Sequence, residues 1–151
     1  MRQPRTHRPG LARSVSRRAF AALTFALAVL AVAPSAWAGS YLDRAALLIG
    51  QATRDADYLR RRLTDRELAR VAHQLAEARL DVASKMQIPP EVAAAHPHVL
   101  LVLSNYERAT RYAEEGRTQQ FLVYQQKAHE EERILRGILK ELGWSLPKDT
   151  P

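Results

Sequence analysis

The sequence predicts an all-α protein: a four-helix bundle built from two helical hairpins and preceded by a cleavable signal peptide. Three observations lead to this prediction. Along four stretches after residue 39, apolar residues recur in alternating steps of three and four, the spacing of one helix face. Residues that typically start or end helices separate these stretches. An arginine-rich and then apolar segment precedes all of them.

The N-terminal segment has the three parts of a secretory signal. Met1–Arg18 carries six arginines and no acidic residue, and Ala19–Ala33 is almost entirely apolar. Pro34-Ser35 follows and is expected to break the helix. Ala36-Trp37-Ala38 then places small residues before a scissile bond, so we predict that residues 1–38 are removed by cleavage ahead of Gly39.

An uncleaved membrane anchor is the alternative interpretation of this segment. A spanning helix needs roughly 20 apolar residues. The segment reaches that length only when Pro34 and Ser35 are included. The composition therefore favours cleavage over retention as an anchor.

The cationic region ends in a short export motif. Ser16-Arg17-Arg18-Ala19-Phe20 resembles the twin-arginine signal, S-R-R-x-F. Ala21 and Ala22 depart from the apolar-then-lysine pair that usually follows, so the twin-arginine and general secretory routes both stay open. Either route implies delivery across a bacterial inner membrane, and we expect a periplasmic or secreted protein.

The net charge of the whole chain differs from that of the product expected after cleavage. The chain has 23 Lys and Arg against 16 Asp and Glu, a net charge of +7. Six arginines lie in residues 1–38 and every acidic residue follows them, which leaves +1 on residues 39–151. The basic balance that would suggest nucleic-acid binding therefore disappears with the leader.

The chain contains no cysteine. This excludes disulfides, a lipid attached at an N-terminal cysteine, and a c-type haem, which needs C-x-x-C-H. Stability must come from apolar packing, which is feasible for one domain of this length.

Four apolar faces define the predicted helices, and all of them show the alternating steps of three and four. The first face comprises Leu42, Ala45, Ile49, Ala52, Ala56, Leu59 and Leu63. The second comprises Leu68, Val71, Leu75, Ala78 and Val82. The third comprises Val99, Val102, Tyr106, Ala109 and Ala113, and Leu103 widens it. The fourth comprises Phe121, Tyr124, Ala128, Glu131, Leu135, Ile138 and Leu142.

Helix-end signals separate the first three helices. Thr64-Asp65-Arg66-Glu67 is a capping box and predicts that the second helix begins at this point. Met86–Pro97 is the one longer linker, in which Pro89-Pro90 stops the second helix and Glu91–Ala95 can add one helical turn. Pro97 suits the first position of the third helix.

The remaining signals bound the fourth helix. Gly116 is expected as a left-handed cap of the third helix, and Thr118 as the cap that starts the fourth. Gly143 and Trp144 predict a Schellman motif at its end. We therefore predict a single helical bundle over residues 39–144 and a frayed tail over residues 145–151.

The histidines are the candidate metal ligands. His96 and His98 are close in sequence at the start of the third helix and could form a weak surface metal site. The expected register of the last two helices places His98 level with Leu135 and His129 level with Ser104, too far from His96 and His98 for one ion. His73 lies off the second apolar face and is expected to be solvated.

Catalytic groups are harder to assemble from this sequence. Ser104 and His129 would share a level, but nothing predicts a strained turn or an oxyanion hole beside them, so we predict no catalytic residue. Glu131 is the one member of an acidic run on an apolar face. It is expected either to reach the solvated rim, which we favour, or to be partly buried and set the helix register.

These observations predict a non-enzymatic binding or scaffolding module whose partner is another protein. We expect no cofactor, no nucleic-acid partner and no membrane span after cleavage, and the oligomeric state stays open. The alternative is a metal- or small-ligand-binding helical bundle that uses His96 and His98.

Overall fold

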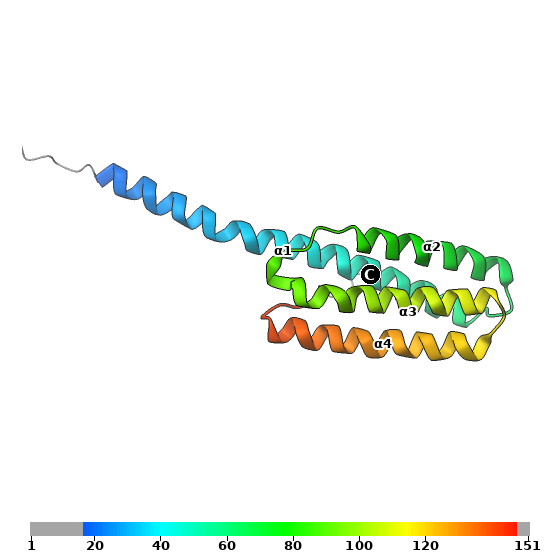
Figure 1. Ribbon diagram of the computed structural model, residues 1–151. Coiled ribbons are helices and arrows are strands. Elements are labelled where there is room, and N and C mark those ends of the chain that lie inside the picture. Colours follow the sequence, from blue (N-terminus) through cyan, green and yellow to red (C-terminus); the bar gives the residue numbers. More distant parts are fainter. Residues whose placement is uncertain (1–16, 148–151) are drawn as a thin grey trace, which may run out of the picture. The chain divides into compact units, whose positions relative to one another are not determined.

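The computed structural model describes the backbone of residues 17–147 and the side chains of residues 36–147. This part of the chain is all-α and contains no strand, which confirms the predicted class (Figure 1). The elements are α1 (Arg17–Arg60), α2 (Arg66–Ser84), a 3₁₀ helix η1 (Pro90–Ala95), α3 (His96–Glu114) and α4 (Thr118–Glu141). The chain divides into two units, Met1–Ala33 and Pro34–Pro151.

Helix α1 runs through the predicted helix break. Pro34 and Ser35 lie inside α1, so the expectation that they end the helix is wrong. A proline removes one helical hydrogen bond, but tertiary packing supplies most of a helix's stability. Here Ala38, Tyr41 and Leu42 are buried directly after it and hold this part of α1 in place.

The predicted leader falls largely outside what the structure describes. Residues 1–16 lie outside it altogether, and of residues 17–35 only the helical backbone is described, so the twin-arginine motif and the apolar run are not tested. Where side chains are described, no helix is both long and apolar enough to cross a membrane.

The second unit is held together by helix packing. Helix α3 packs against both α2 and α4, and η1 contacts α3 and α4 (Figure 1). The part of α1 from Ala38 to Leu59 contributes to both clusters of the apolar core. The predicted first face is buried from Leu42 to Leu59, and the predicted third face is buried throughout.

The predicted face of α2 is wrong. Val71, Leu75 and Val82 are 42%, 45% and 53% exposed. The buried residues of this helix are instead Ala69, Ala72, Ala76 and Ala83. Methyl side chains allow close approach of neighbouring helices, and Arg79 of α2 indeed reaches Asp55 of α1. Val71, Leu75 and Val82 are therefore left on the outside, whereas Leu68 and Leu80 are partly buried against the core.

The face of α4 is shifted slightly from its predicted position. Phe121, Ala128 and Leu135 are buried as predicted. Leu142 is exposed, however, and Leu139 and Gln125 take up buried positions. Gln125 is satisfied there because its side chain donates a hydrogen bond of 2.8 Å to Asp57 of α1.

The caps that start α2 and α4 differ from the predicted ones. Asp65, not Thr64, caps α2, because its carboxylate accepts a hydrogen bond from the backbone N–H of Leu68. Thr118 is the first residue of α4 and does not cap it; the cap position is Arg117, which makes no side-chain capping bond. Helix α3 begins at His96, one residue before Pro97.

The glycine caps at the helix ends are confirmed. Gly116 and Gly143 have φ angles of 75° and 80°. The backbone N–H of Trp144 donates to the carbonyl of Leu139 at 2.8 Å, the bond that defines the predicted Schellman motif. The expectation that the tail frays from residue 145 fails at Leu146, which is 5% exposed and belongs to the core.

Candidate functional site

Two features of the second unit are candidates for function: a polar cluster between α2 and α3, and an apolar groove between α1 and α2. The polar cluster is centred on His73, whose side chain is 14% exposed. The expectation that His73 is solvated is therefore wrong. Because α2 buries its alanine face, His73 is turned toward α3 and not toward water.

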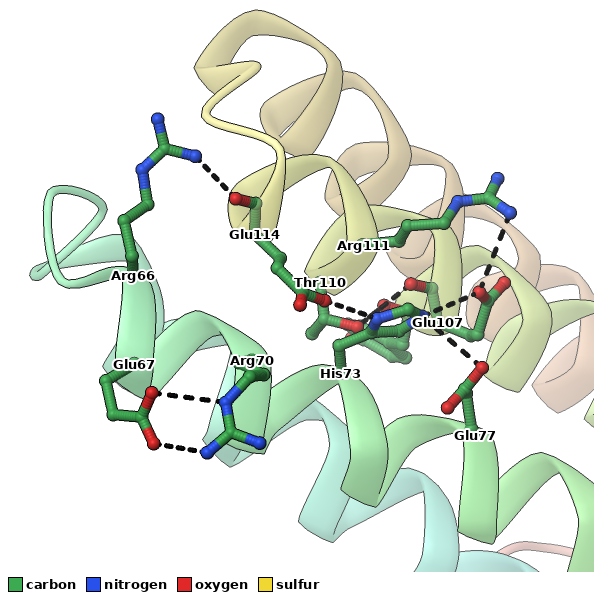
Figure 2. Close-up of polar contacts among 10 residues, drawn as sticks. Arg66, Glu67, Arg70, His73, Glu77, Glu107, Thr110, Arg111 and Glu114 are labelled. Atoms are coloured by element: carbon green, nitrogen blue, oxygen red, sulfur yellow. Dashed lines mark hydrogen bonds and ion pairs between the residues drawn. The ribbon is translucent and has the colours of Figure 1, made fainter.

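Both ring nitrogens of His73 meet carboxylates from α3, as Figure 2 shows. Nδ1 lies 2.7 Å from Glu114 Oε2, and Nε2 lies 3.2 Å from Glu107 Oε1. Glu77, one turn further along α2, brings a third carboxylate to 3.7 Å from Nε2. Ionised carboxylates only accept hydrogen bonds, so this arrangement favours a ring that is protonated on both nitrogens.

The electrostatics of the cluster agree with this assignment. Burial lowers the pKa of His73, but the hydrogen bonds to Glu114 and Glu107, together with the charges of Glu77 and Glu107, outweigh it and raise the pKa above 6.5. Charges in such a partly desolvated place interact more strongly than in water. The cluster therefore ties α2 to α3 by charge.

Three arginines lie at the edge of the cluster, and none of them takes the place of His73 between the carboxylates. Arg111 Nη1 lies 3.9 Å from Glu107 Oε1, and Arg66 Nη1 donates to the backbone carbonyl of Glu114 at 2.5 Å (Figure 2). Arg70 is paired with Glu67. The carboxylates of Glu77 and Glu114 remain directed at His73.

His96 and His98 are not brought together. His96 is buried, and its Nδ1 lies 2.8 Å from the hydroxyl of Tyr41 on α1. His98 Nδ1 instead lies 2.5 Å from Glu131 Oε1 on α4. The Glu131 side chain is 17% exposed in this pair, so it is partly buried and the favoured rim position is wrong, whereas a role in setting the helix register stays a prediction.

The expected levels of His98 and His129 along the last two helices also differ from the observed ones. His98 faces Glu131, about one turn from its expected level at Leu135. His129 is exposed and its Nδ1 lies 3.4 Å from the hydroxyl of Tyr106, two residues from its expected level at Ser104. Over residues 36–147, His73, Glu77 and Glu107 are the group of three whose potential ligand atoms all lie within 4.8 Å of one another.

Sequence reasoning missed this group, although its spacing was visible. His73 and Glu77 are four residues apart, and Glu107 and Glu114 are seven apart, so each pair shares one helix face. Assigning the alanine face of α2 to the core would have turned His73 and Glu77 toward a neighbouring helix. Because the Leu and Val face was assigned to the core instead, His73 and Glu77 were expected to point toward water.

The second feature is the apolar groove, defined here as Val71, Leu75, Ala78 and Val82, which are exposed on α2, together with the partly buried Leu68 and with Tyr58 of α1. A shallow pocket of about 70 Å³ at one end is lined by Asp55, Tyr58, Leu68, Val71, Ala72 and Leu75. A larger pocket of about 360 Å³ at the other end is lined by Trp37, Ser40, Tyr41, Arg44, Val82, Lys85, Met86 and Gln87. Apolar side chains follow α2 from Leu68 to Val82, and the pocket at the Val82 end is also lined by the polar and charged residues Ser40, Arg44, Lys85 and Gln87.

No family model, curated protein or solved structure matches this chain.

Proposed function

We propose that this chain is an exported, non-enzymatic helical module that binds a partner protein through the apolar groove. The observation that carries the proposal is the exposure of Val71, Leu75 and Val82 in one row. Single exposed apolar residues are ordinary on protein surfaces. A continuous row of them on one helix is typical of a surface that another protein covers.

The spacing of the row indicates the shape of the partner. Its members alternate in steps of three and four, the pattern by which one helix packs against another. Exposed apolar positions at this spacing match the helix-in-groove mode of recognition, in which the partner presents its own apolar stripe. We therefore infer that the partner contributes an amphipathic helix.

The charges beside the groove indicate the chemistry of that helix. Arg44 lines the pocket that contains Val82, and Arg62 places its guanidinium carbon 4.6 Å from the ring centre of Tyr58 at the opposite end. Both arginines belong to the α1 side. A partner helix with acidic residues along the edge that faces α1 would complement them, and such complementarity favours encounter and fixes orientation.

The finer architecture and the location form part of the same proposal. We infer a bundle of two hairpins, α1 with α2 and α3 with α4, that is delivered to the periplasm or exterior after removal of residues 1–38. The short connections after Arg60 and Glu114 support the hairpins, and the composition of the leader supports export. The polar cluster and the buried His96 stabilise the bundle in this proposal.

Site-specific photocrosslinking in the native cell tests the docking surface. A photoreactive residue at Val71, Leu75 or Val82 should crosslink to one and the same protein. Val123 of α4 is also exposed and apolar, at 51%, and serves as the matched control position. Crosslinks of equal yield from Val123, or none from α2, would contradict the proposal.

Purified components then test the chemistry. Leu75→Asp should weaken binding of the crosslinked partner by more than about tenfold, since a charge would enter an apolar contact. Val123→Asp should leave the affinity unchanged, and both variants should melt like the wild type because both positions are exposed. The crosslinked segment should be helical and acidic. A basic or extended segment would refute the inferred partner.

A further inference from the structure

The polar cluster has the composition of a metal site as well as that of a structural ion pair. A structural pair needs one cation and one anion, whereas here three carboxylates gather around one imidazole. Arg111 is the other cation in direct contact, at 3.9 Å from Glu107. With a neutral ring, the three carboxylates carry −3, which Arg111 at 3.9 Å from Glu107 and the more distant Arg70 offset only in part, and a divalent cation would add to this balance.

The spacing of the candidate ligand atoms fits one ion. Ligands bonded to Zn²⁺ at about 2.1 Å in tetrahedral geometry lie about 3.4 Å apart. His73 Nε2 lies 3.2 Å from Glu107 Oε1 and 3.7 Å from Glu77 Oε1. The metal would take the place of the proton on Nε2, and little movement of the backbone is required.

The fourth residue of the cluster has the role of an orienting group. Glu114 Oε2 accepts from His73 Nδ1 at 2.7 Å. A metal-bound histidine usually donates its other N–H to a carboxylate, which fixes the ring and increases its basicity. The structure already holds the ring in this way and leaves Nε2 directed at the other two carboxylates.

The ligand types narrow the choice of metal. One imidazole nitrogen and two carboxylate oxygens suit first-row divalent ions such as Zn²⁺ or Mn²⁺, whereas Ca²⁺ and Mg²⁺ prefer oxygen alone. Three protein ligands leave coordination positions open, and Glu77, with a side chain 60% exposed, lies on the solvent side. An ion could therefore enter from solvent and retain bound water.

The geometry points to a first-row divalent transition-metal site formed by His73, Glu77 and Glu107, with Glu114 as the orienting residue. The site joins α2 to α3 and is independent of the apolar groove. Its place differs from the pair His96 and His98 that the sequence suggested.

Calorimetric titration of the purified, untagged protein with ZnCl₂, after removal of metal by a chelator, tests the site. The wild type should bind one equivalent, and CoCl₂ should give visible d–d absorption bands at the same stoichiometry. Glu77→Gln should weaken binding by at least about tenfold without disturbing the fold, because this side chain is mostly exposed. Glu114→Gln should weaken binding by about 10–100-fold through loss of ring orientation.

Two control variants separate this site from other histidines and carboxylates. His98→Gln removes the other partly buried histidine–glutamate pair, and Glu67→Gln removes an exposed carboxylate of α2. Both should bind Zn²⁺ like the wild type. Absence of saturable binding to the wild type, unchanged affinity of Glu77→Gln, or loss of binding in His98→Gln would each overturn the assignment.

Discussion

The hydroxyl of Tyr41 lies 2.8 Å from Nδ1 of His96 and joins two residues that are 55 positions apart. Both side chains are buried, and burial raises the pKa of Tyr41 to about 12, so the phenol keeps its proton and can donate it to an unprotonated Nδ1. The histidine that accepts this bond must be neutral at Nδ1. Burial accordingly lowers the pKa of His96 below 6.5.

We predict that the bundle loses stability in mild acid through His96. Its pKa is lower in the folded than in the unfolded chain, so the unfolded chain binds the proton first. The contribution is complete above pH 6.5 and declines as the pH falls through the folded-state pKa. Denaturant unfolding across this range should show the decline in the wild type and a smaller one in His96→Gln.

The comparison with His96→Gln isolates this residue from His73. The raised pKa of His73 acts in the opposite sense, since its contribution is complete below pH 6.5 and declines as the pH rises through its folded-state value. His73 is present in both proteins and cancels in the difference. An identical acid decline in the two proteins would show that His96 is not the source.

A pair of adjacent residues tests which face of α2 is buried. Leu75→Ala should change the free energy of unfolding by less than about 0.5 kcal/mol, because the side chain is already exposed. Ala76→Leu should destabilise by about 1–3 kcal/mol, because the larger side chain must enter a filled interface. Urea denaturation measures both. A larger loss of stability in Leu75→Ala than in Ala76→Leu would show that the face predicted from the sequence is the buried one.

Fully buried leucines of the other helices provide the reference for that comparison. Leu103→Ala and Leu135→Ala should each cost about 2–5 kcal/mol, the range for emptied core positions.

The fold class and the apolar faces of α1 and α3 could be predicted, and that of α4 in part, because large side chains such as Leu59, Tyr106 and Phe121 mark their buried positions. The face of α2 could not, because pattern reasoning assigns the largest apolar residues to the core. In α2 the core positions are occupied by Ala69, Ala72 and Ala76. Alanine is weakly apolar and common on helix surfaces, so only the neighbouring helices reveal that it is buried.

The failure to predict the polar cluster has the same cause as the wrong face of α2. With Leu75 assigned to the core, His73 necessarily pointed outward and its carboxylate partners could not be suspected. The contact also joins residues 41 positions apart, from His73 to Glu114. Its register depends on the length of the linker between α2 and α3, which sequence spacing alone does not determine.

Three glycines should respond differently to alanine. Gly137→Ala should stabilise by about 0.5–1 kcal/mol, because Gly137 is an exposed residue within α4 with open space around it. Gly143→Ala should destabilise by about 1–2 kcal/mol, because its φ is 80°.

Gly116→Ala should be the most destabilising of the three. Its φ is 75°, and an added Cβ would also overlap the guanidinium of Arg66. Arg66 would have to move and give up its bond to the Glu114 carbonyl. Melting temperatures should therefore follow the order Gly137→Ala, wild type, Gly143→Ala, Gly116→Ala. A Gly116→Ala variant as stable as the wild type would contradict the described turn.

The ion pair between α1 and α2 should behave as a unit. Arg79 Nη2 lies 2.5 Å from Asp55 Oδ2, and Arg79 Nη1 is buried without a hydrogen-bond partner. Asp55→Ala should cost about 1–3 kcal/mol because it leaves a largely buried guanidinium with no acceptor. Arg79→Met should cost less, because an apolar side chain suits the site and Asp55 can reach water.

A double variant completes this test. Asp55→Ala combined with Arg79→Met should be more stable than the sum of the single effects predicts, since the unpaired charge is no longer present. Strict additivity in urea denaturation would mean that the two residues do not interact.

The continuity of α1 bears on whether cleavage of the leader can follow folding. The proposed scissile bond after Ala38 lies inside a helix, and the Ala38 side chain is 0% exposed. Its peptide groups are engaged in helical hydrogen bonds, and its methyl group is covered by the bundle. A peptidase that cuts at this bond must reach it before α1 docks. If residues 1–38 are removed at this bond as proposed, processing must precede docking of α1, and a precursor that folds first would protect the leader from removal.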